Sequence, residues 1–544
     1  MKLDNLARRV ACAALSASLA FNSGPSWAAE DTFLSGVQVY SNRLIDWAYD
    51  IGLTREEGVN RAGRITKLSN EAGFDIKRGG SQLSEMSYQL RQDGRMWGME
   101  ALLPILKTNN MKLNLVIVGT HKDDIDPSAP LTRNGPDTAI PPKSERVREV
   151  VRHVVALAQQ YGVEVHLEVG NEPDLYNAST GFCYWRSNLA RYKEFVNDVS
   201  VAAHAVDPNA KIVNGGLVLG EVDREGYLAY AIEALKAGQL WALNIHHHGS
   251  LEQLSEAWNR TKGWTPEIEA LKSKVILNET GSSAGTEHEN AVNVAGKLLF
   301  AKAMGFKGAY IFHMGGLPAK AMQDLWEGDP NGRGDFSLVD VNLNPKEGYY
   351  ALKAANTIVK GLPPVKILSD GQDRDASGKG RWAFLFDDGS RKVLVGIRQR
   401  PTDAEIKEAF GSASYAEYGM DGSAATPGSN GGGIVYLVSG FVPEEETPDE
   451  PDPTPGPGGD TPVTPEPPSE PDSTPALGGD TPVTPETPDK PASTPPPGGD
   501  TPSTPTTPNG DPSNEDGSSS GGCDAGWGMI CLTALAAMFL GRRQ

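Results

Sequence analysis

The stretch VEVHLEVGNEP, residues 163–173, decides how the rest of the chain is interpreted. Its apolar, β-branched part predicts a strand, and Gly170 begins a loop that carries Glu172 directly after the strand ends. Further along, KVILNETG, residues 274–281, repeats the arrangement with Glu279. In a barrel of parallel strands, chemistry takes place at the carboxyl ends of the strands. The two glutamates are therefore the first candidates for functional side chains.

Around these two strands, strand-like and helix-like segments alternate between about residues 30 and 360, which predicts parallel βα units. The pattern favours the α/β class and a (β/α)8 TIM barrel over residues 29–360, with Glu172 after the fourth strand and Glu279 on the seventh. An open doubly wound sheet is the alternative, and it is disfavoured because no Gly-x-Gly-x-x-Gly follows a strand. The eight strands are predicted at residues 33–40, 73–78, 111–118, 163–169, 211–214, 240–246, 275–278 and 308–312.

The clearest predicted helix is residues 144–161, where valines recur at helical spacing on one face. Ser144 is expected to cap its N-terminus, and Gly162 is expected to end it. Further helices are predicted at residues 189–206, 225–237, 289–304 and 346–359.

After Gly361 short strand-like runs replace the βα alternation. Residues 381–387 and 392–397 flank the turn residues Asp388-Gly389-Ser390, as the two strands of a hairpin do, and residues 434–442 read as another strand. We expect a small antiparallel, β-sandwich-like domain over residues 361–443, with a structural role.

The N-terminal residues 1–28 have the composition of an export signal. Lys2, Arg8 and Arg9 form the charged region, residues 10–21 the apolar core, and Ser26-Trp27-Ala28 a small-residue cleavage site. A buried helix is the alternative, but it does not require this order of features.

Residues 444–520 are predicted to be a disordered linker rich in Pro, Thr, Gly and Asp. The motif Gly-Gly-Asp-Thr-Pro recurs at Gly458, Gly478 and Gly498, in repeats that contain almost nothing to bury. Seventeen acidic residues and one lysine lie in this segment, so it carries most of the formal net charge of −20. The preceding body is only mildly acidic, and no patch is basic enough for nucleic acid.

Residues 521–544 combine Gly521-Gly522-Cys523, an apolar run at residues 527–540, and Arg542-Arg543. This end resembles the GlyGly-CTERM type of sorting signal found in bacteria with an outer membrane. The resemblance implies a sorting peptidase that acts near Gly522-Cys523, and transfer of the protein to the cell surface. A simple membrane anchor is the alternative.

Only one cysteine, Cys183, lies in the predicted body, because Cys12 belongs to the export signal and Cys523 and Cys531 to the C-terminal segment. No disulfide can form within the body. The body must therefore be stabilised by burial of apolar side chains alone.

Two carboxyl groups on opposite sides of a glycosidic bond supply both a proton for the leaving oxygen and a nucleophile for the anomeric carbon. In the retaining version the two groups are about 5–5.5 Å apart, which side chains on the fourth and seventh strands of a barrel can reach. One carboxyl must begin protonated and the other ionised. Asn171 can place an amide beside the sugar 2-hydroxyl.

The motif Asn171-Glu172-Pro173, with Glu279 ending a later strand, resembles the clan A retaining glycoside hydrolases. It is most similar to the heparanase and β-glucuronidase family. The resemblance implies that Glu172 is the acid/base and Glu279 the nucleophile. Two departures affect the expected site: His248 stands where the clan often has a tyrosine that bonds the nucleophile, and Phe312 begins a segment where many relatives have tryptophan.

Several other side chains near the predicted strand ends are candidates for substrate binding. Arg78 ends the second strand and is expected either to meet the substrate or to form a structural ion pair, as is its neighbour Lys77. Sugar rings stack on aromatic side chains, and the loop aromatic residues Tyr176 and Trp185 are candidates for such platforms, with packing as the alternative. Trp97 and Tyr184 are further aromatic residues in or near the loops.

His246-His247-His248 ends the predicted sixth strand, and alternation sends His246 and His248 to the same side. We expect these two to bind substrate. No companion cysteine or carboxylate spacing supports a metal site, so no metal and no cofactor are expected.

Together these patterns predict an exported, surface-anchored retaining β-glycosidase that acts on an oligo- or polysaccharide. A non-catalytic carbohydrate-binding or adhesive surface protein on a barrel scaffold is the alternative. The sugar, the linkage and the balance between hydrolysis and transglycosylation are set by loop residues that the sequence pattern does not identify.

Overall fold

The computed structural model describes residues 33–177, 182–223, 225–283, 285–318, 336–375, 377–429 and 431–440. The predicted export signal, linker and sorting segment lie outside these residues. None of the described helices is long and apolar enough to span a membrane.

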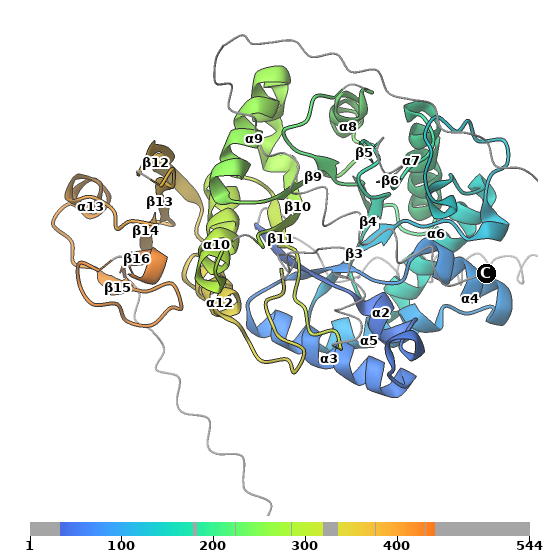
Figure 1. Ribbon diagram of the computed structural model, residues 1–544, viewed down its shortest axis with the longest axis horizontal. Helices are drawn as coiled ribbons and strands as arrows, with labels where there is room; N and C mark the ends of the chain where they lie inside the picture. The colour runs from blue at the N-terminus through green and yellow to red at the C-terminus, as the bar shows by residue number, and fades with distance from the viewer. Residues whose placement is uncertain are drawn as a thin grey trace, which may run out of the picture. The chain divides into compact units, whose positions relative to one another are not determined.

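Nine parallel strands form one sheet that curves into a nearly closed barrel (Figure 1). Its order, β7-β4-β3-β2-β1-β11-β10-β9-β8, returns upon itself, and a bridge between Val213 and Ala242 brings the two ends together. β7 and β8 are one barrel strand interrupted at Gly215-Gly216, so the barrel has eight strand positions, as predicted. The strands are β1 (Leu34–Val39), β2 (Ile76–Gly79), β3 (Lys112–Ile117), β4 (Val165–Val169), β7 (Lys211–Asn214), β8 (Leu217–Val218), β9 (Leu243–His248), β10 (Val275–Gly281) and β11 (Gly308–Ile311).

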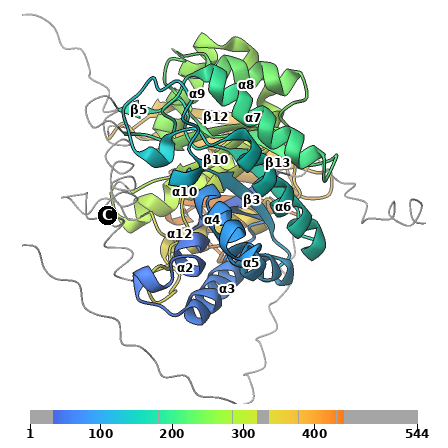
Figure 2. The same ribbon diagram turned by 90° about the vertical axis from the view of Figure 1, so that its right-hand side faces the viewer.

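Helices cover the outside of this barrel, and the view in Figure 2 shows several of them around the strands. The longest, α6 (Ser144–Tyr161), buries its valine stripe and ends at Gly162, which has a left-handed φ of 65°. The predicted cap is wrong by one residue: Lys143 precedes the first turn, Ser144 is helical, and no side chain caps this end. The other main barrel helices are α3 (Arg55–Glu71), α4 (Leu83–Asp93), α5 (Trp97–Thr108), α7 (Leu189–His204), α8 (Tyr227–Lys236), α9 (Leu251–Trp264), α10 (Glu287–Ala303) and α12 (Glu347–Ile358).

The amino-terminal end of the barrel interior is filled by side chains. A cluster of buried residues that includes Leu34, Ile276 and Tyr310 lies here, with Trp241 packed against it. The Trp241 ring lies between the ammonium groups of Lys211 and Lys307, at 4.6 and 4.5 Å from its centroid. This end is therefore a packed core and not an opening.

The carboxyl end of the barrel has an irregularity that affects Glu279. The pairing of β10 with β9 shifts between Leu277 and Glu279, so that Glu279 lies opposite His246. Such a bulge redirects the side chains that follow it. It brings the last residues of β9 and β10 to the same point of the barrel rim.

A second, antiparallel sheet of five strands follows the barrel, in the order β12-β13-β14-β16-β15. The predicted hairpin is confirmed as β13 and β14. The described residues form one sheet and not the two sheets of a sandwich. The reason lies in what covers it: one face belongs to the same apolar core as the barrel, and the other packs on α13 (Asp403–Phe410). The strands are β12 (Pro364–Arg374), β13 (Gly380–Asp387), β14 (Lys392–Ile397), β15 (Ala416–Tyr418) and β16 (Ile434–Ser439).

Arg398, which follows β14, ties this sheet to the barrel helices. Its guanidinium donates to Glu252 Oε1 at 3.0 Å, Glu289 Oε2 at 2.9 Å and Asn293 Oδ1 at 3.1 Å. Its φ of 67° is left-handed, a backbone conformation that costs free energy for arginine and alanine alike, so the substitution does not change this cost. We expect Arg398→Ala to lower the free energy of unfolding by about 2–4 kcal/mol, because Glu252 is left buried without its partner.

Urea unfolding of the wild-type protein and of Arg398→Ala measures this difference in the free energy of unfolding. Arg374→Ala is the matched control, since it removes an ion pair to Glu256 from the same sheet in which both side chains are well exposed. It is expected to cost about 1 kcal/mol or less. Equal losses in the two variants would contradict the role given to Arg398.

Candidate active site

Glu172 lies in the tight turn that follows β4. Gly170 and Glu172 both have left-handed φ values, 85° and 41°, and this turn directs the glutamate side chain inward. Its carboxylate is buried, and Oε1 accepts a hydrogen bond from His246 Nδ1 at 2.8 Å. Oε2 has no hydrogen-bond partner among the described residues. One oxygen of Glu172 is therefore fixed by the protein, and the other is available to carry a proton.

Glu279 lies on β10 just after the bulge, and its two oxygens have different partners. Oε2 accepts a hydrogen bond from the Arg78 guanidinium, and Oε1 lies 3.1 Å from His248 Nε2. The side chain is 4% exposed. Both oxygens thus lie next to nitrogen donors, which favours the ionised form.

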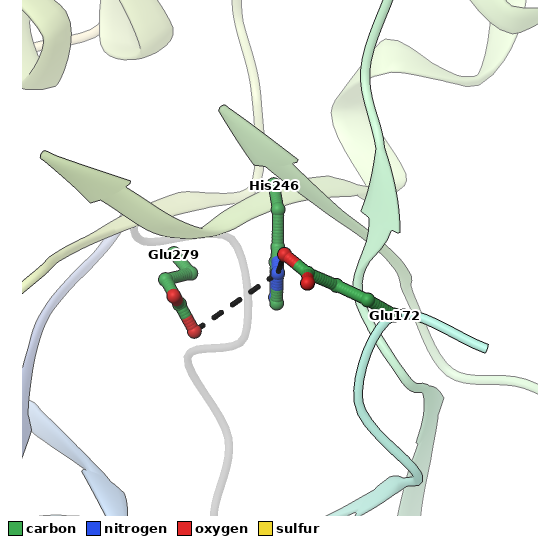
Figure 3. A group of neighbouring side chains, drawn as sticks. All are labelled: Glu172, His246 and Glu279. Carbon is green, nitrogen blue, oxygen red and sulfur yellow. Dashed lines mark hydrogen bonds and ion pairs between the residues drawn. The ribbon is translucent and has the colours of Figure 1, made fainter. Parts of the chain in front are cut away.

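The two glutamates and His246 face one another from three different strand ends (Figure 3). One oxygen of Glu172, one of Glu279 and a ring nitrogen of His246 lie within 4.8 Å of one another. His246 Nδ1 is 2.8 Å from Glu172 and 3.9 Å from Glu279. The nearest oxygens of the two carboxylates are thus closer to the ~5–5.5 Å spacing of a retaining pair than to the ~6.5–9.5 Å of an inverting pair.

Arg78 ends β2 and is 2% exposed. Nε and Nη2 donate to the two oxygens of Glu168 at 2.9 and 2.8 Å, and Nη2 also donates to Asn171 Oδ1 at 2.7 Å. Nη1 donates to Gln38 and Glu279. Every guanidinium nitrogen is thus engaged by the protein, so Arg78 forms the ion pairs that were one of its two predicted roles, and contact with substrate stays a prediction.

Glu168, on β4, is a functional neighbour that the sequence analysis did not single out. It is fully buried and accepts hydrogen bonds from Arg78, as above, and from Asn114 Nδ2 at 2.5 Å. Its Oε1 lies 3.8 Å from His246 Nε2. The sequence does contain a pattern that could have identified Glu168. Alternation along a buried strand turns His166, Glu168 and the residue at 170 to one face, and a carboxylate buried there requires a charged or hydrogen-bonding partner.

The electrostatics follow from these contacts. Burial opposes ionisation of Glu279, but Arg78 and His246 outweigh it and hold the pKa of the carboxyl well below its usual range. Burial likewise opposes ionisation of Glu168, and Arg78 with His246 lowers its pKa to about 2. Burial works against a charge on His246, yet Glu279, Glu168 and Glu172 together raise its pKa to about 9. At neutral pH the site therefore holds two buried carboxylates and a protonated histidine.

A cavity of about 100 Å³ opens beside Glu279. Arg78, Asn171 and Glu279 contribute to its wall, together with the aromatic residues Tyr40, Tyr184 and Phe312. Burial raises the pKa of the Tyr184 hydroxyl, and the charges of Glu172 and Glu279 raise it further. Glu172 itself, 1% exposed, is not part of the wall.

Two of the predicted aromatic platforms do not lie at this cavity. Trp185 is buried, stacks on Phe195 with ring centroids 5.4 Å apart, and donates its indole N–H to the Asn188 carbonyl, so its prediction as a substrate contact is wrong. Tyr176 lies under the guanidinium of Arg133 at 5.5 Å and not in the cavity wall. The sequence pattern could not show that the loop after β4 turns its aromatic residues toward α7.

His246 and His248 lie on the same side of β9, as alternation predicted, and both reach the two glutamates. They contact the glutamates and not the cavity. His248 takes the place expected for a tyrosine and supports Glu279 through its ring nitrogen. Its ring also meets Phe312 and Phe336 edge-on, at centroid distances of 5.1 and 5.4 Å.

Glu172, His246 and Glu279 are also the three groups close enough together to hold a metal ion among the described residues. In this arrangement, however, His246 is protonated and bonds Glu172 directly. A cation would have to displace that proton and compete with Arg78 for Glu279.

No known protein family matches the chain, and no curated protein is similar to it in sequence. Solved structures with a similar fold include a family 39 glycoside hydrolase from Bacteroides cellulosilyticus WH2, at 16% identity over 75% of this chain and 81% of that one, with a TM-score of 0.49. A family 30 subfamily 8 xylanase from Clostridium acetobutylicum is 11% identical over 75% and 96% of the two chains, with a TM-score of 0.48. A monomeric β-xylosidase from Caulobacter crescentus CB15 is 18% identical over 69% and 75%, with a TM-score of 0.45.

Proposed function

We propose that this protein is a retaining β-glycosidase in which Glu279 is the nucleophile and Glu172 the general acid and base. The observation that carries the proposal is the short separation of two buried carboxylates at the carboxyl ends of β4 and β10, one of which, Glu279, lines a cavity. The two differ as the reaction requires: Glu279 is held ionised by Arg78, and Glu172 has one oxygen without a partner in the described structure.

In the first step Glu279 attacks the anomeric carbon while Glu172 protonates the departing glycosidic oxygen, which gives a glycosyl ester of Glu279 and a free alcohol. In the second step Glu172 takes a proton from water as the water oxygen attacks the anomeric carbon and the ester bond breaks. Because Glu172 is covered in the free protein, substrate binding requires side chains at the cavity wall to move. Tyr184 is a wall residue whose pKa is raised by the charges of both carboxylates, and it is our candidate for such a movement.

The purified protein, screened against aryl β-glycosides including glucuronides and xylosides, tests the proposal. Proton NMR of the first product formed from an active substrate should show the β-anomer, which then mutarotates. A first-formed α-anomer would mean inversion and would overturn the assigned roles. Binding of glycans without turnover across the panel would instead favour a non-catalytic carbohydrate-binding protein.

The location of the enzyme is a second part of the proposal, supported by the composition of its two ends. Residues 1–28 would direct export, residues 444–520 would separate the body from the envelope, and cleavage by a sorting peptidase near Gly522-Cys523 would release it to the surface of a bacterium. Mass spectrometry of the C-terminus of the protein taken from the cell surface tests this. An intact C-terminal arginine pair would contradict the cleavage.

Gly216, between β7 and β8, provides a test of the His246 position. A Cβ at this residue would lie 1.9 Å from His246 Nε2, so Gly216→Ala must displace the imidazole that fixes Glu172. Misplacement of a catalytic group by about 1 Å can cost roughly 100-fold, and we expect kcat/KM to fall by ~10–100-fold.

Gly263→Ala in α9 is the matched control, because a Cβ there meets nothing within 4 Å. It should leave kcat/KM unchanged. Wild-type activity in Gly216→Ala, with the same melting temperature, would show that the contact of His246 with Glu172 is not needed.

A further inference from the structure

Three carboxylates and two cations of the proposed active site form one buried network. The exposed fractions are 2% for Arg78, 0% for Glu168, 1% for Glu172, 1% for His246 and 4% for Glu279. Glu168 is the carboxylate of the network that no step of the reaction uses. Like Glu279 it contacts both cations, since it forms a bidentate pair with Arg78 and lies 3.8 Å from His246.

The two cations of this network lie against two carboxylates that are held ionised. Arg78 and His246 are positive, and Glu168 and Glu279 are negative. An unpaired charge in a buried site is expensive, so a second buried cation requires a second carboxylate beside it. Glu168 is placed to be that carboxylate.

We propose that Glu168 is a positioning residue that holds Arg78 and His246 in place and supplies the counter-charge that keeps His246 protonated against Glu172. The inference rests on the proposed function and assigns a part in it to a third carboxylate. Arg78 in turn holds Glu279, and His246 holds Glu172, so Glu168 links the nucleophile to the acid through one partner on each side.

The other ionisable groups around the network contribute less than Glu168 does to the charge on His246. Burial raises the pKa of Tyr310 on β11, and the charge of Glu168 raises it further. Burial and then the charge of Glu279 do the same for Tyr40, so both tyrosines are neutral at working pH. His248 lies against Glu279. Asp174 adjoins Glu172 and His246, and burial followed by the charge of Glu172 raises its pKa to about 7. The groups that face the network are therefore Tyr40, Asp174, Tyr184, His248 and Tyr310.

Removal of the Glu168 charge should lower the pKa of His246. Glu168→Gln keeps the size of the side chain but leaves one excess positive charge, which destabilises protonated His246. The imidazolium that holds Glu172 then loses its proton at lower pH. The alkaline limb of the kcat/KM profile should therefore move to lower pH by about one unit or more, which corresponds to tenfold or more in the ionisation of His246.

The experiment compares pH profiles of the wild type, Glu168→Gln, Glu168→Asp and a control on an aryl β-glycoside that the wild type hydrolyses. Glu168→Asp retains the charge, so it should keep the alkaline limb in place even if kcat falls. Glu164→Gln is the matched control, because it also removes a carboxylate next to β4. The Glu164 carboxylate pairs with Lys112 and Lys211 and contacts no residue of the proposed active site. A uniform loss of activity in Glu168→Gln, with the limb unmoved, would overturn the proposal.

A second measurement needs neither substrate nor a folded Glu168 variant. In the wild-type protein with labelled histidine, the His246 ring, assigned with His246→Asn, should remain protonated above pH 8 and titrate well above its ordinary value. Titration of His246 near pH 6.5 would overturn the proposal even in an active enzyme. A protein that hydrolyses no glycoside, but whose His246 titrates as expected, would instead refute the proposed function and leave the charge network intact.

Discussion

Glu279→Ala should lose at least ~10⁴-fold in kcat on every glycoside that the wild type hydrolyses, because no other group in the described site can form the glycosyl ester. The protein should remain folded, since Arg78 keeps its bidentate pair with Glu168. Added azide should restore part of the activity on an activated aryl β-glycoside. It attacks the anomeric carbon directly from the vacated side while Glu172 still protonates the leaving group, so the product is the α-glycosyl azide.

The configuration of that product makes the test specific. NMR of the isolated azide distinguishes the α from the β product, and circular dichroism confirms that the variant is folded. Glu56→Ala, at an exposed position of α3, is the control for a lost surface carboxylate and should retain full activity. Activity within tenfold of the wild type in Glu279→Ala would exclude Glu279 as the nucleophile.

Glu172→Ala should show a different pattern that depends on the leaving group. A general acid contributes about 10²–10⁴-fold, so hydrolysis of substrates with poor leaving groups should fall by that factor. An activated leaving group needs no proton, so the first step on such a substrate should be nearly unaffected and the glycosyl ester of Glu279 should accumulate. A burst of released phenol followed by slow turnover is the kinetic signature.

Azide again assigns the role. In Glu172→Ala it attacks the glycosyl ester from the side that water would use, so the product should be the β-glycosyl azide, opposite to that of Glu279→Ala. A uniform loss across all leaving groups, with no burst, would show that Glu172 acts in substrate binding or in structure and not as the acid.

The strand pattern of the sequence was sufficient to predict the barrel and to bring Glu172 and Glu279 together. A parallel barrel places all strand ends at one rim, so a residue that directly follows a buried strand has a nearly fixed position. The same argument placed His246 and His248, because alternation along β9 is a local property of the backbone.

The contacts between strands could not be predicted in this way. The pairing of Arg78 with Glu168 depends on which interior positions of β2 and β4 lie at the same height, and strand register is not encoded in either segment alone. Trp185 shows the corresponding limit for loops: its composition suited a sugar platform, but the fold of the loop after β4 turned it into the core against Phe195. One hairpin of the antiparallel sheet was predicted correctly, while the single-sheet form of that domain and what covers its two faces depended on tertiary packing.

The packed end of the barrel around Trp241 limits how molecules can enter and leave the proposed active site. Since the lysine-flanked indole and the apolar side chains behind it close that end, the sugar, the departing alcohol and the incoming water must all use the rim where the glutamates lie. The alcohol must then leave before water takes its place, which imposes an ordered, ping-pong sequence. Any second alcohol that fills the vacated position faster than water would be joined to the sugar, so high acceptor concentrations should turn the protein from a degrading catalyst into a synthetic one.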